Sequence, residues 1–223
     1  MISLIGFLLP LGIGAAISPV SIAVCLMLLN TRKPLANAVA FLIGYSAVLV
    51  TIGTFSLVFF GGGGAEDAER PSDIKNTIDA VFGIFFLVLA LKSWLKAPDP
   101  NAPPPSWIAA ISTIGVSKAL LFGMVIMATN FSSLPLYLSG LKEIVTANIG
   151  IVDSLLVLTL FILLVEVGLL VPIAAYALAP HRSSAVLGAT LRWLEKNNRV
   201  ISIFIFVIFG ILLFAKGITG LWG

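Results

Sequence analysis

Residues 149–179 read IGIVDSLLVLTLFILLVEVGLLVPIAAYALA, and this stretch decides the fold class of the chain. A helix needs about 20 apolar residues to cross the hydrocarbon core of a bilayer. The stretch exceeds that length, and its only charged residues are Asp153 and Glu166. It therefore predicts a membrane-spanning helix with one carboxyl group near its centre.

Five further apolar segments are each long enough to span a membrane: residues 2–29, 35–60, 77–95, 111–141 and 200–221. The chain of 223 residues is 59% hydrophobic and 10% charged, whereas soluble domains carry about 25% charged residues. Six spanning helices leave only short loops, which excludes a soluble catalytic domain. We expect an all-α integral membrane protein with six transmembrane helices.

A proline-rich stretch, residues 97–106, predicts an extended linker between two parts of the chain, residues 1–96 and 107–223. Each part holds three spanning segments, and this odd number places the two parts in opposite orientations. That layout is an inverted repeat, which is common in alternating-access transporters. Residues 183–198 have leucines at helical spacing, which predicts an amphipathic helix on the inner membrane surface.

The basic residues are distributed unevenly among the predicted loops. With the N-terminus outside, most of the 13 Lys and Arg residues lie on the inner side. The residues that fall outside are Arg70, Lys75, Lys142 and Lys216. The positive-inside rule therefore favours an inner (plasma) membrane protein with both termini outside.

Ser18-Pro19-Val20-Ser21 interrupts the first apolar segment near its middle. Because Pro19 has no amide hydrogen to donate to the carbonyl of Ala15, the helix is expected to break here. Ser18 is suited to cap a restarted half-helix that has Pro19 at its first position. The break would expose backbone dipoles at membrane depth.

Residues 130–135, NFSSLP, form a comparable feature in the fourth segment, where Asn130 can cap and Pro135 frees the carbonyl of Phe131. Two broken helices in corresponding positions of two halves point to a transport site. The alternative is a pair of proline kinks that only shape helix packing. The residues that we predict to bind substrate are Ser18, Pro19, Ser21, Asn130, Ser132, Ser133 and Pro135.

Glu166 is the candidate for proton coupling. An ionised carboxylate near the centre of a spanning helix costs at least about 2.5 to 3.5 kcal/mol on insertion scales. We expect Glu166 to face the bundle interior, where it carries protons or contacts a cationic part of the substrate. The alternative is a structural glutamic acid that donates to a freed carbonyl. Asp79 and Asp153 are expected to cap the outer starts of their helices.

Several other functions lack the residues they need. A single histidine excludes a multi-histidine metal site, and a single cysteine excludes an intrachain disulfide. The sequence contains no phosphate-binding loop for ATP hydrolysis, no nucleophile with its base and no basic face for nucleic acid. We expect a protein that is not an enzyme and uses no metal or cofactor.

Several stretches resemble the GAP family of the LysE transporter superfamily, the mycobacterial peptidoglycolipid and sulfolipid addressing proteins. They include residues 17–21, the basic turn Arg32-Lys33 and, most specifically, residues 192–201, RWLEKNNRVI. The resemblance covers nearly the whole chain and implies a six-helix inner-membrane protein that helps to move an envelope glycolipid out of the cytoplasmic leaflet. Phe131 and Ser132 replace the family's usual proline and lysine, which removes a charge that could meet an anionic headgroup.

Three functions remain open. The first is a secondary exporter of an envelope (glyco)lipid, with proton coupling and a cavity between the two broken helices. The second is LysE-type efflux of a small cationic or zwitterionic solute such as an amino acid. The third is a membrane scaffold for a lipid synthesis or export complex. Besides membrane lipid, the partners we consider are a second copy of the chain and a lipid-synthesis enzyme.

Overall fold

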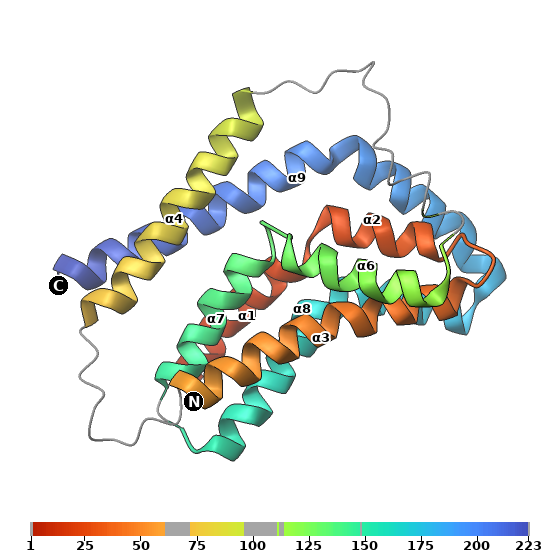
Figure 1. Cartoon of the computed structure of the whole chain (residues 1–223). Helices are drawn as coiled ribbons and strands as arrows, with labels where there is room; N and C mark the ends of the chain where they lie inside the picture. Colours follow the sequence, from red (N-terminus) through yellow and green to blue (C-terminus); the bar gives the residue numbers. More distant parts are fainter. Residues whose placement is uncertain (1, 61–71, 96–110, 112–113, 148, 223) are drawn as a thin grey trace.

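The computed structural model describes the chain except for residues 1, 61–71, 96–110, 112–113, 148 and 223. Within this described part every regular element is an α-helix (Figure 1). The helices are α1 (Ile2–Ala16), α2 (Pro19–Leu28), α3 (Pro34–Phe60), α4 (Ser72–Leu95), α6 (Val116–Ala128), α7 (Leu134–Thr146), α8 (Ile151–Leu178) and α9 (Pro180–Trp222). The prediction of an all-α protein is confirmed, and the predicted linker, residues 97–106, lies outside the described residues.

The helices are those of a multi-pass membrane protein. By length and composition, four segments could each cross a membrane: Pro34–Phe59, Asn76–Leu95, Ile151–Leu178 and Lys196–Trp222. The α1–α2 pair passes the same test as a fifth span that is bent by 53° at its break. The remaining predicted span, residues 111–141, is divided between α7 and the short apolar helix α6.

Glycines allow α3 and α6 to cross at close range. A Cβ atom at Gly44 on α3 would collide with the carbonyl oxygen of Leu120 on α6. A Cβ atom at Gly123 on α6 would collide with the carbonyl oxygen of Phe41 on α3. Small residues at such crossings are typical of membrane helices, which associate through close packing rather than through a hydrophobic driving force.

The α4 helix packs mainly along α9 (Figure 1). This contact is also close, because a Cβ atom at Gly83 would collide with the backbone of Phe214 and one at Gly217 with that of Ala80. The α9 helix in turn contacts α2 and α8, while α4 contacts α7. The α4–α9 pair is therefore attached to the other helices mostly through α9.

The segment 183–198 differs from the prediction of a separate interfacial helix. It is the first part of α9, which runs without interruption from Pro180 to Trp222. No proline occurs between residues 181 and 222, so the sequence contains no strong helix breaker there. Leu187 and Leu194 are buried and Leu191 packs against the core, so the apolar side of the segment is covered by protein.

Candidate functional site

The first break separates α1 from α2 at Ile17 and Ser18. Ser18 has an extended backbone conformation, with φ −102° and ψ 104°, and its hydroxyl oxygen accepts a hydrogen bond from the amide of Ser21 at 3.5 Å. Pro19 occupies the first position of α2, where its missing amide hydrogen is harmless. The predicted break and its serine cap are both confirmed.

The second break, residues 129–133, separates α6 from α7. The Oδ1 atom of Asn130 accepts hydrogen bonds from the amides of Ser132 and Ser133, at 3.2 and 3.1 Å, and from the hydroxyl of Ser132 at 2.7 Å. Asn130 therefore caps the turn that leads into α7, as predicted. The residue directly before α7 is Ser133, and Pro135 lies in the first turn of that helix.

Side chains that are far apart in the sequence join the two breaks. The amide of Asn130 donates hydrogen bonds to the hydroxyl oxygens of Ser18 and Ser21, both at 2.9 Å. The hydroxyl of Ser133 donates to the carbonyl of Ala15 at 2.7 Å. This is the carbonyl that the proline of the first break leaves without its helical donor. The second break therefore supplies the hydrogen bond that the first break lacks.

We call Ser18, Ser21, Asn130 and Ser133 the break cluster. The exposed fractions of these residues are 2%, 2%, 9% and 0%, respectively. Such irregular backbone is tolerated at membrane depth only where protein groups or a water-filled cavity satisfy it. Here protein side chains from the opposite half of the chain do so.

Two neighbouring residues of α3, Tyr45 and Ser46, lie close to Glu166. Glu166 lies on α8, is 4% exposed as expected for an interior residue, and accepts a hydrogen bond from the hydroxyl of Ser46 at 2.5 Å. Tyr45 lies beside Ser21 and Ser133, and also close to Glu166. The described partner of Glu166 is thus a hydroxyl group rather than a freed carbonyl.

Tyr45 and Ser46 were not predicted as site residues, because no sequence signal points to them. Hydroxyl-bearing residues in a spanning helix follow no motif, and the contact between Ser46 and Glu166 joins residues that lie on different halves of the chain. Close packing at Gly168 helps to bring them together, because a Cβ atom there would collide with the carbonyl oxygen of Ala16 at the first break. The α8 helix therefore passes directly beside the break.

A pocket of about 210 Å³ lies beside the break cluster. The residues that line it come from α2, α6, α9 and the second break: Pro19, Val20, Ile126, Thr129, Asn130, Phe131, Ser132, Ser202 and Phe206. Its described lining offers one amide, three hydroxyl groups and two aromatic rings, and none of these residues is charged. Glu166 is not among them, so the pocket and the carboxyl group are separate parts of the candidate site.

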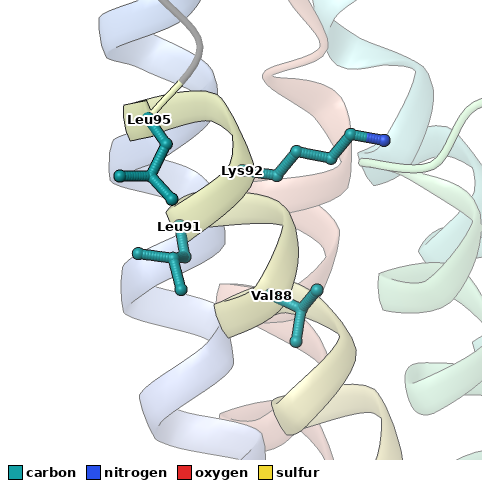
Figure 2. A pocket seen from close by; sticks show the side chains of 4 residues that line it. All are labelled: Val88, Leu91, Lys92 and Leu95. Carbon is teal, nitrogen blue, oxygen red and sulfur yellow. The ribbon is translucent and has the colours of Figure 1, made fainter.

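A second pocket, of about 520 Å³, lies along the end of α4, and its described lining consists of Val88, Leu91, Lys92 and Leu95 (Figure 2). Lys92 extends away from Leu91 and Leu95. Nearby, the guanidinium of Arg199 donates to the last carbonyls of α4. An apolar groove with basic groups at its end suits contact with surrounding lipid better than a specific ligand.

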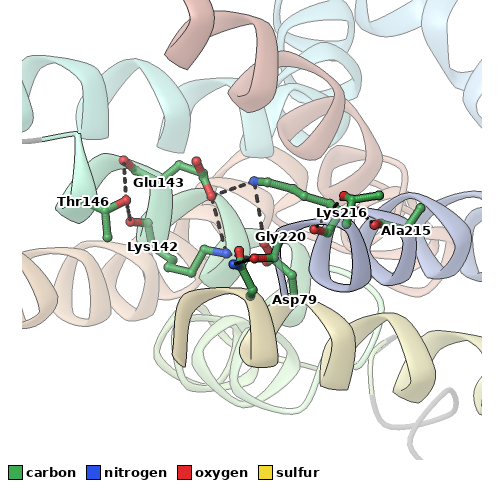
Figure 3. Close-up of polar contacts among 9 residues, drawn as sticks. Asp79, Lys142, Glu143, Thr146, Ala215, Lys216 and Gly220 are labelled. Carbon is green, nitrogen blue, oxygen red and sulfur yellow. Dashed lines mark hydrogen bonds and ion pairs between the residues drawn. The ribbon is translucent and has the colours of Figure 1, made fainter. Parts of the chain in front are cut away.

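Four charged side chains meet elsewhere in the bundle, and we call Asp79, Lys142, Glu143 and Lys216 the ionic cluster (Figure 3). The ammonium of Lys142 lies 2.5 Å from Asp79, and that of Lys216 lies 2.8 Å from Glu143. The prediction that Asp79 caps a helix is wrong, because α4 begins at Ser72 and Asp79 lies beyond its first turn. Asp153 does lie in the first turn of α8.

The ionic cluster was not predicted from the sequence. Its members come from α4, α7 and α9, and each of them falls at the edge of an apolar segment, where a charge is usually solvated. The positive-inside rule assigned Lys142 and Lys216 to the outer side of the membrane. It did not indicate that their side chains turn inward toward a buried carboxylate.

Comparison with protein families gives a match over most of the chain. The model of the family described as Sap, sulfolipid-1-addressing protein, matches residues 8–219. The matched range includes both breaks, Glu166 and the ionic cluster. No curated protein and no solved structure matches the chain.

Proposed function

Because the chain belongs to the sulfolipid-1-addressing protein family, we propose that it is an inner-membrane exporter that moves an envelope glycolipid or a related amphiphile out of the cytoplasmic leaflet. The family description supports a role with lipid, and the transport step is our inference from the site. The proposal makes the protein a secondary transporter of the LysE superfamily and not an enzyme.

The pairing of the helices supports two inverted repeats of three spans each. If residues 1–96 correspond to residues 107–223, then α1 and α2 correspond to α6 and α7, α3 to α8, and α4 to α9. Several helix contacts follow this exchange, since α1 contacts α8 while α6 contacts α3, and α2 contacts α3 while α7 contacts α8. In addition, α4 packs against its own counterpart α9. The first span of each repeat is then the broken one.

The observation that carries the proposal is the position of Asn130. Its side chain holds the two breaks together and also lines the 210 Å³ pocket. A group that enters the pocket would meet the same amide that keeps the two halves joined. Binding could therefore change the contact between the halves, which is the requirement for alternating access.

The pocket lining favours an uncharged polar group as the part of the substrate that binds there. Hydroxyl groups of Thr129, Ser132 and Ser202 can donate or accept hydrogen bonds, and the rings of Phe131 and Phe206 offer apolar faces. A few polar groups in a mainly apolar pocket are typical of ligand sites. The acyl chains of such a substrate would remain in the surrounding bilayer.

We assign proton coupling to Glu166. A carboxyl group inside a spanning helix is a candidate for a proton relay, and Tyr45 lies close both to Glu166 and to the break cluster. A change in its protonation would change whether it accepts or donates in its contact with Ser46. Tyr45, which borders the break cluster, lies close enough to Glu166 to respond to the change in its charge.

A second candidate function is efflux of a small solute. The size of the pocket favours it, because about 210 Å³ lies below the range of about 300 to 1,000 Å³ that is common for ligand sites. The described lining does not favour a cationic solute, since it contains no carboxylate.

Lipid mass spectrometry of a deletion strain tests the proposal. Surface-extractable and total lipids are compared after complementation with the wild type, Asn130→Ala or Asn197→Ala. Asn197 is the matched control because its side chain bonds within α9, to the carbonyl of Trp193. We expect one lipid to disappear from the surface but remain in the total pool in the deletion strain and in the strain that carries Asn130→Ala. The wild type and Asn197→Ala should restore that lipid to the surface.

Two results would contradict lipid export. Unchanged surface and total pools in the deletion strain would favour small-solute efflux. Failure of the purified protein to move the identified lipid in liposomes, with export in cells intact, would favour a scaffold within a larger complex.

A further inference from the structure

The ionic cluster joins three helices at one place. Asp79 belongs to α4, Lys142 and Glu143 to α7, and Lys216 to α9 (Figure 3). Besides the two shortest pairs, Lys216 lies 3.6 Å from Asp79, and Lys142 lies 3.4 Å from Glu143. Each ammonium group thus faces both carboxylates, and the four formal charges sum to zero.

Three of these side chains are largely withdrawn from the surface, and Lys216 is partly exposed. The exposed fraction of the side chain is 1% for Asp79, 9% for Glu143, 11% for Lys142 and 28% for Lys216. The ammonium of Lys216 also lies 4.2 Å from the centre of the Phe7 ring on α1, a favourable cation–π contact. The cluster therefore brings the α4–α9 pair against both α7 and α1.

The position of the cluster relative to the pocket is defined along two helices. On α9, Lys216 follows the pocket residue Ser202 by a helical distance of about 21 Å. On α7, Glu143 follows the break residue Ser133 by about 15 Å. Both helices lead from the break cluster toward the end that carries Lys142 and Lys216, which is the predicted outer end.

Net stabilisation is a poor explanation for such a cluster. Removing charges from water costs free energy that their mutual attraction only partly offsets, so a buried ion pair is weak evidence for stability. The two shortest pairs require that α4, α7 and α9 lie together, because Lys142 of α7 pairs with Asp79 of α4 and Glu143 of α7 pairs with Lys216 of α9. These two pairs are formed in one arrangement of the helices and lost when the α4–α9 pair separates from α7, which is the property of a two-state contact.

We propose that the ionic cluster is the outer gate of the transport path, closed in this structure. This inference rests on the proposed export function and adds the residues that close the path beyond the break cluster. Release of the substrate to the outside requires the α4–α9 pair to separate from α7, and the ion pairs oppose that step. Asp79 is the central residue of the gate because it is the most buried of the four side chains and both lysines pair with it.

Thiol labelling measures the opening of this end directly. The native thiol is removed by Cys25→Ala, since Cys25 is the chain's single cysteine and is buried. Ser139→Cys then provides a reporter, because Ser139 is 1% exposed and lies on α7 one turn before Glu143, between the cluster and the second break. A membrane-impermeant methanethiosulfonate reagent is added from outside.

We expect Asp79→Asn to increase the rate at which the Ser139→Cys reporter is labelled from outside by about tenfold, within the range typical of conformational coupling. Asp153→Asn is the matched control, since Asp153 is an exposed acidic residue at the start of α8 and lies outside the cluster. It should leave the rate unchanged. Lys216→Gln changes the most exposed member of the cluster and should increase the labelling rate as Asp79→Asn does. It replaces Asp79→Asn in the test if that variant does not fold.

A second reporter separates gating from general loosening. Ser202→Cys, in the pocket lining, is labelled from the inside in inverted vesicles. An opened outer gate should leave this rate unchanged or lower it. Three results would overturn the proposal. The first is labelling of the Ser139→Cys reporter at the wild-type rate in the folded Asp79→Asn and Lys216→Gln variants. The others are labelling of this reporter only from the inside, or an increase in the labelling rates of both reporters together. Because the assay uses no substrate, it can succeed even if the exported molecule is not a lipid.

Discussion

The break cluster and the ionic cluster are both buried and polar, but they differ in charge and in position along the helices. The break cluster contains only hydroxyl and amide groups and lies at the interruptions of two helices. The ionic cluster contains two ammonium and two carboxylate groups and lies near the ends of α7 and α9. A neutral hydrogen bond can be exchanged for another at small cost, whereas a buried charge depends on its counter-ion.

This difference separates two tasks. The break cluster suits a place where contacts must rearrange around a bound group, because its donors and acceptors can find new partners in that group. The ionic cluster suits a barrier that is either formed or broken. Substitutions in the two clusters should therefore differ in their effect on stability.

The largest effect is expected for Lys142→Met in the ionic cluster. The substitution leaves Asp79, whose side chain is 1% exposed, with Lys216 at 3.6 Å as its remaining described ion-pair partner. Loss of one partner of a buried pair should lower the free energy of unfolding by about 3 to 5 kcal/mol. Thermal and denaturant unfolding of the purified protein in detergent measure this change.

The double variant Asp79→Leu/Lys142→Met sharpens that test. It removes one charge of each sign and leaves the pair of Lys216 with Glu143. Replacing a buried pair by apolar residues of similar volume is often neutral or stabilising, so the double variant should recover most of the lost stability. A double variant as unstable as Lys142→Met would show that the cost does not come from an unpaired charge.

A smaller effect is expected for Ser133→Ala in the break cluster. The substitution leaves the carbonyl of Ala15 without its donor, which should lower the free energy of unfolding by about 1 to 3 kcal/mol. Ser139→Ala is the control, because Ser139 is equally buried and its hydroxyl has no hydrogen-bond partner among the described residues. Equal losses of stability in the two variants would mean that the contact between the breaks contributes little.

The two clusters also differ in how far the sequence predicts them. Pro19 and Pro135 act on their own helices, so local rules were enough to predict both breaks and the capping roles of Ser18 and Asn130. The hydrogen bonds between Asn130 and Ser18 depend on how the two halves pack, which no local rule contains. The sequence indicated the residues of the break cluster but not their contacts with one another.

For the ionic cluster the local rule gave the wrong answer. Asp79 lies two residues after the start of the predicted apolar segment, a place where an acidic residue usually caps a helix. The helix begins earlier, at Ser72, because polar residues can extend a helix beyond its apolar part. Asp79 is therefore inside α4, and its partners come from helices whose arrangement the sequence does not reveal.

Glu166→Gln should have a small effect on stability and a large one on transport. The amide oxygen of Gln can still accept the hydrogen bond from Ser46, so we expect the free energy of unfolding to change by less than about 1 kcal/mol. Export should fall by at least about tenfold if the carboxyl group carries protons. Lipid export that remains at the wild-type level, in a protein that is equally abundant in the membrane, would exclude proton coupling at Glu166.

The smallest effect on stability is expected for Ser202→Ala, which removes a hydroxyl group from the pocket lining without touching either cluster. The described hydrogen bond of this hydroxyl is a long one, 3.4 Å to Asn198 on the same helix, so stability should stay within about 0.5 kcal/mol of wild type. If the hydroxyl binds the substrate, loss of a hydrogen bond worth about 1 kcal/mol should raise the substrate concentration for half-maximal export by about fivefold. The control is Thr190→Ala, since Thr190 is an exposed residue of α9 whose hydroxyl bonds within the helix, to Val186. An unchanged concentration for Ser202→Ala would place the substrate elsewhere and leave the break cluster as a structural joint between the two halves.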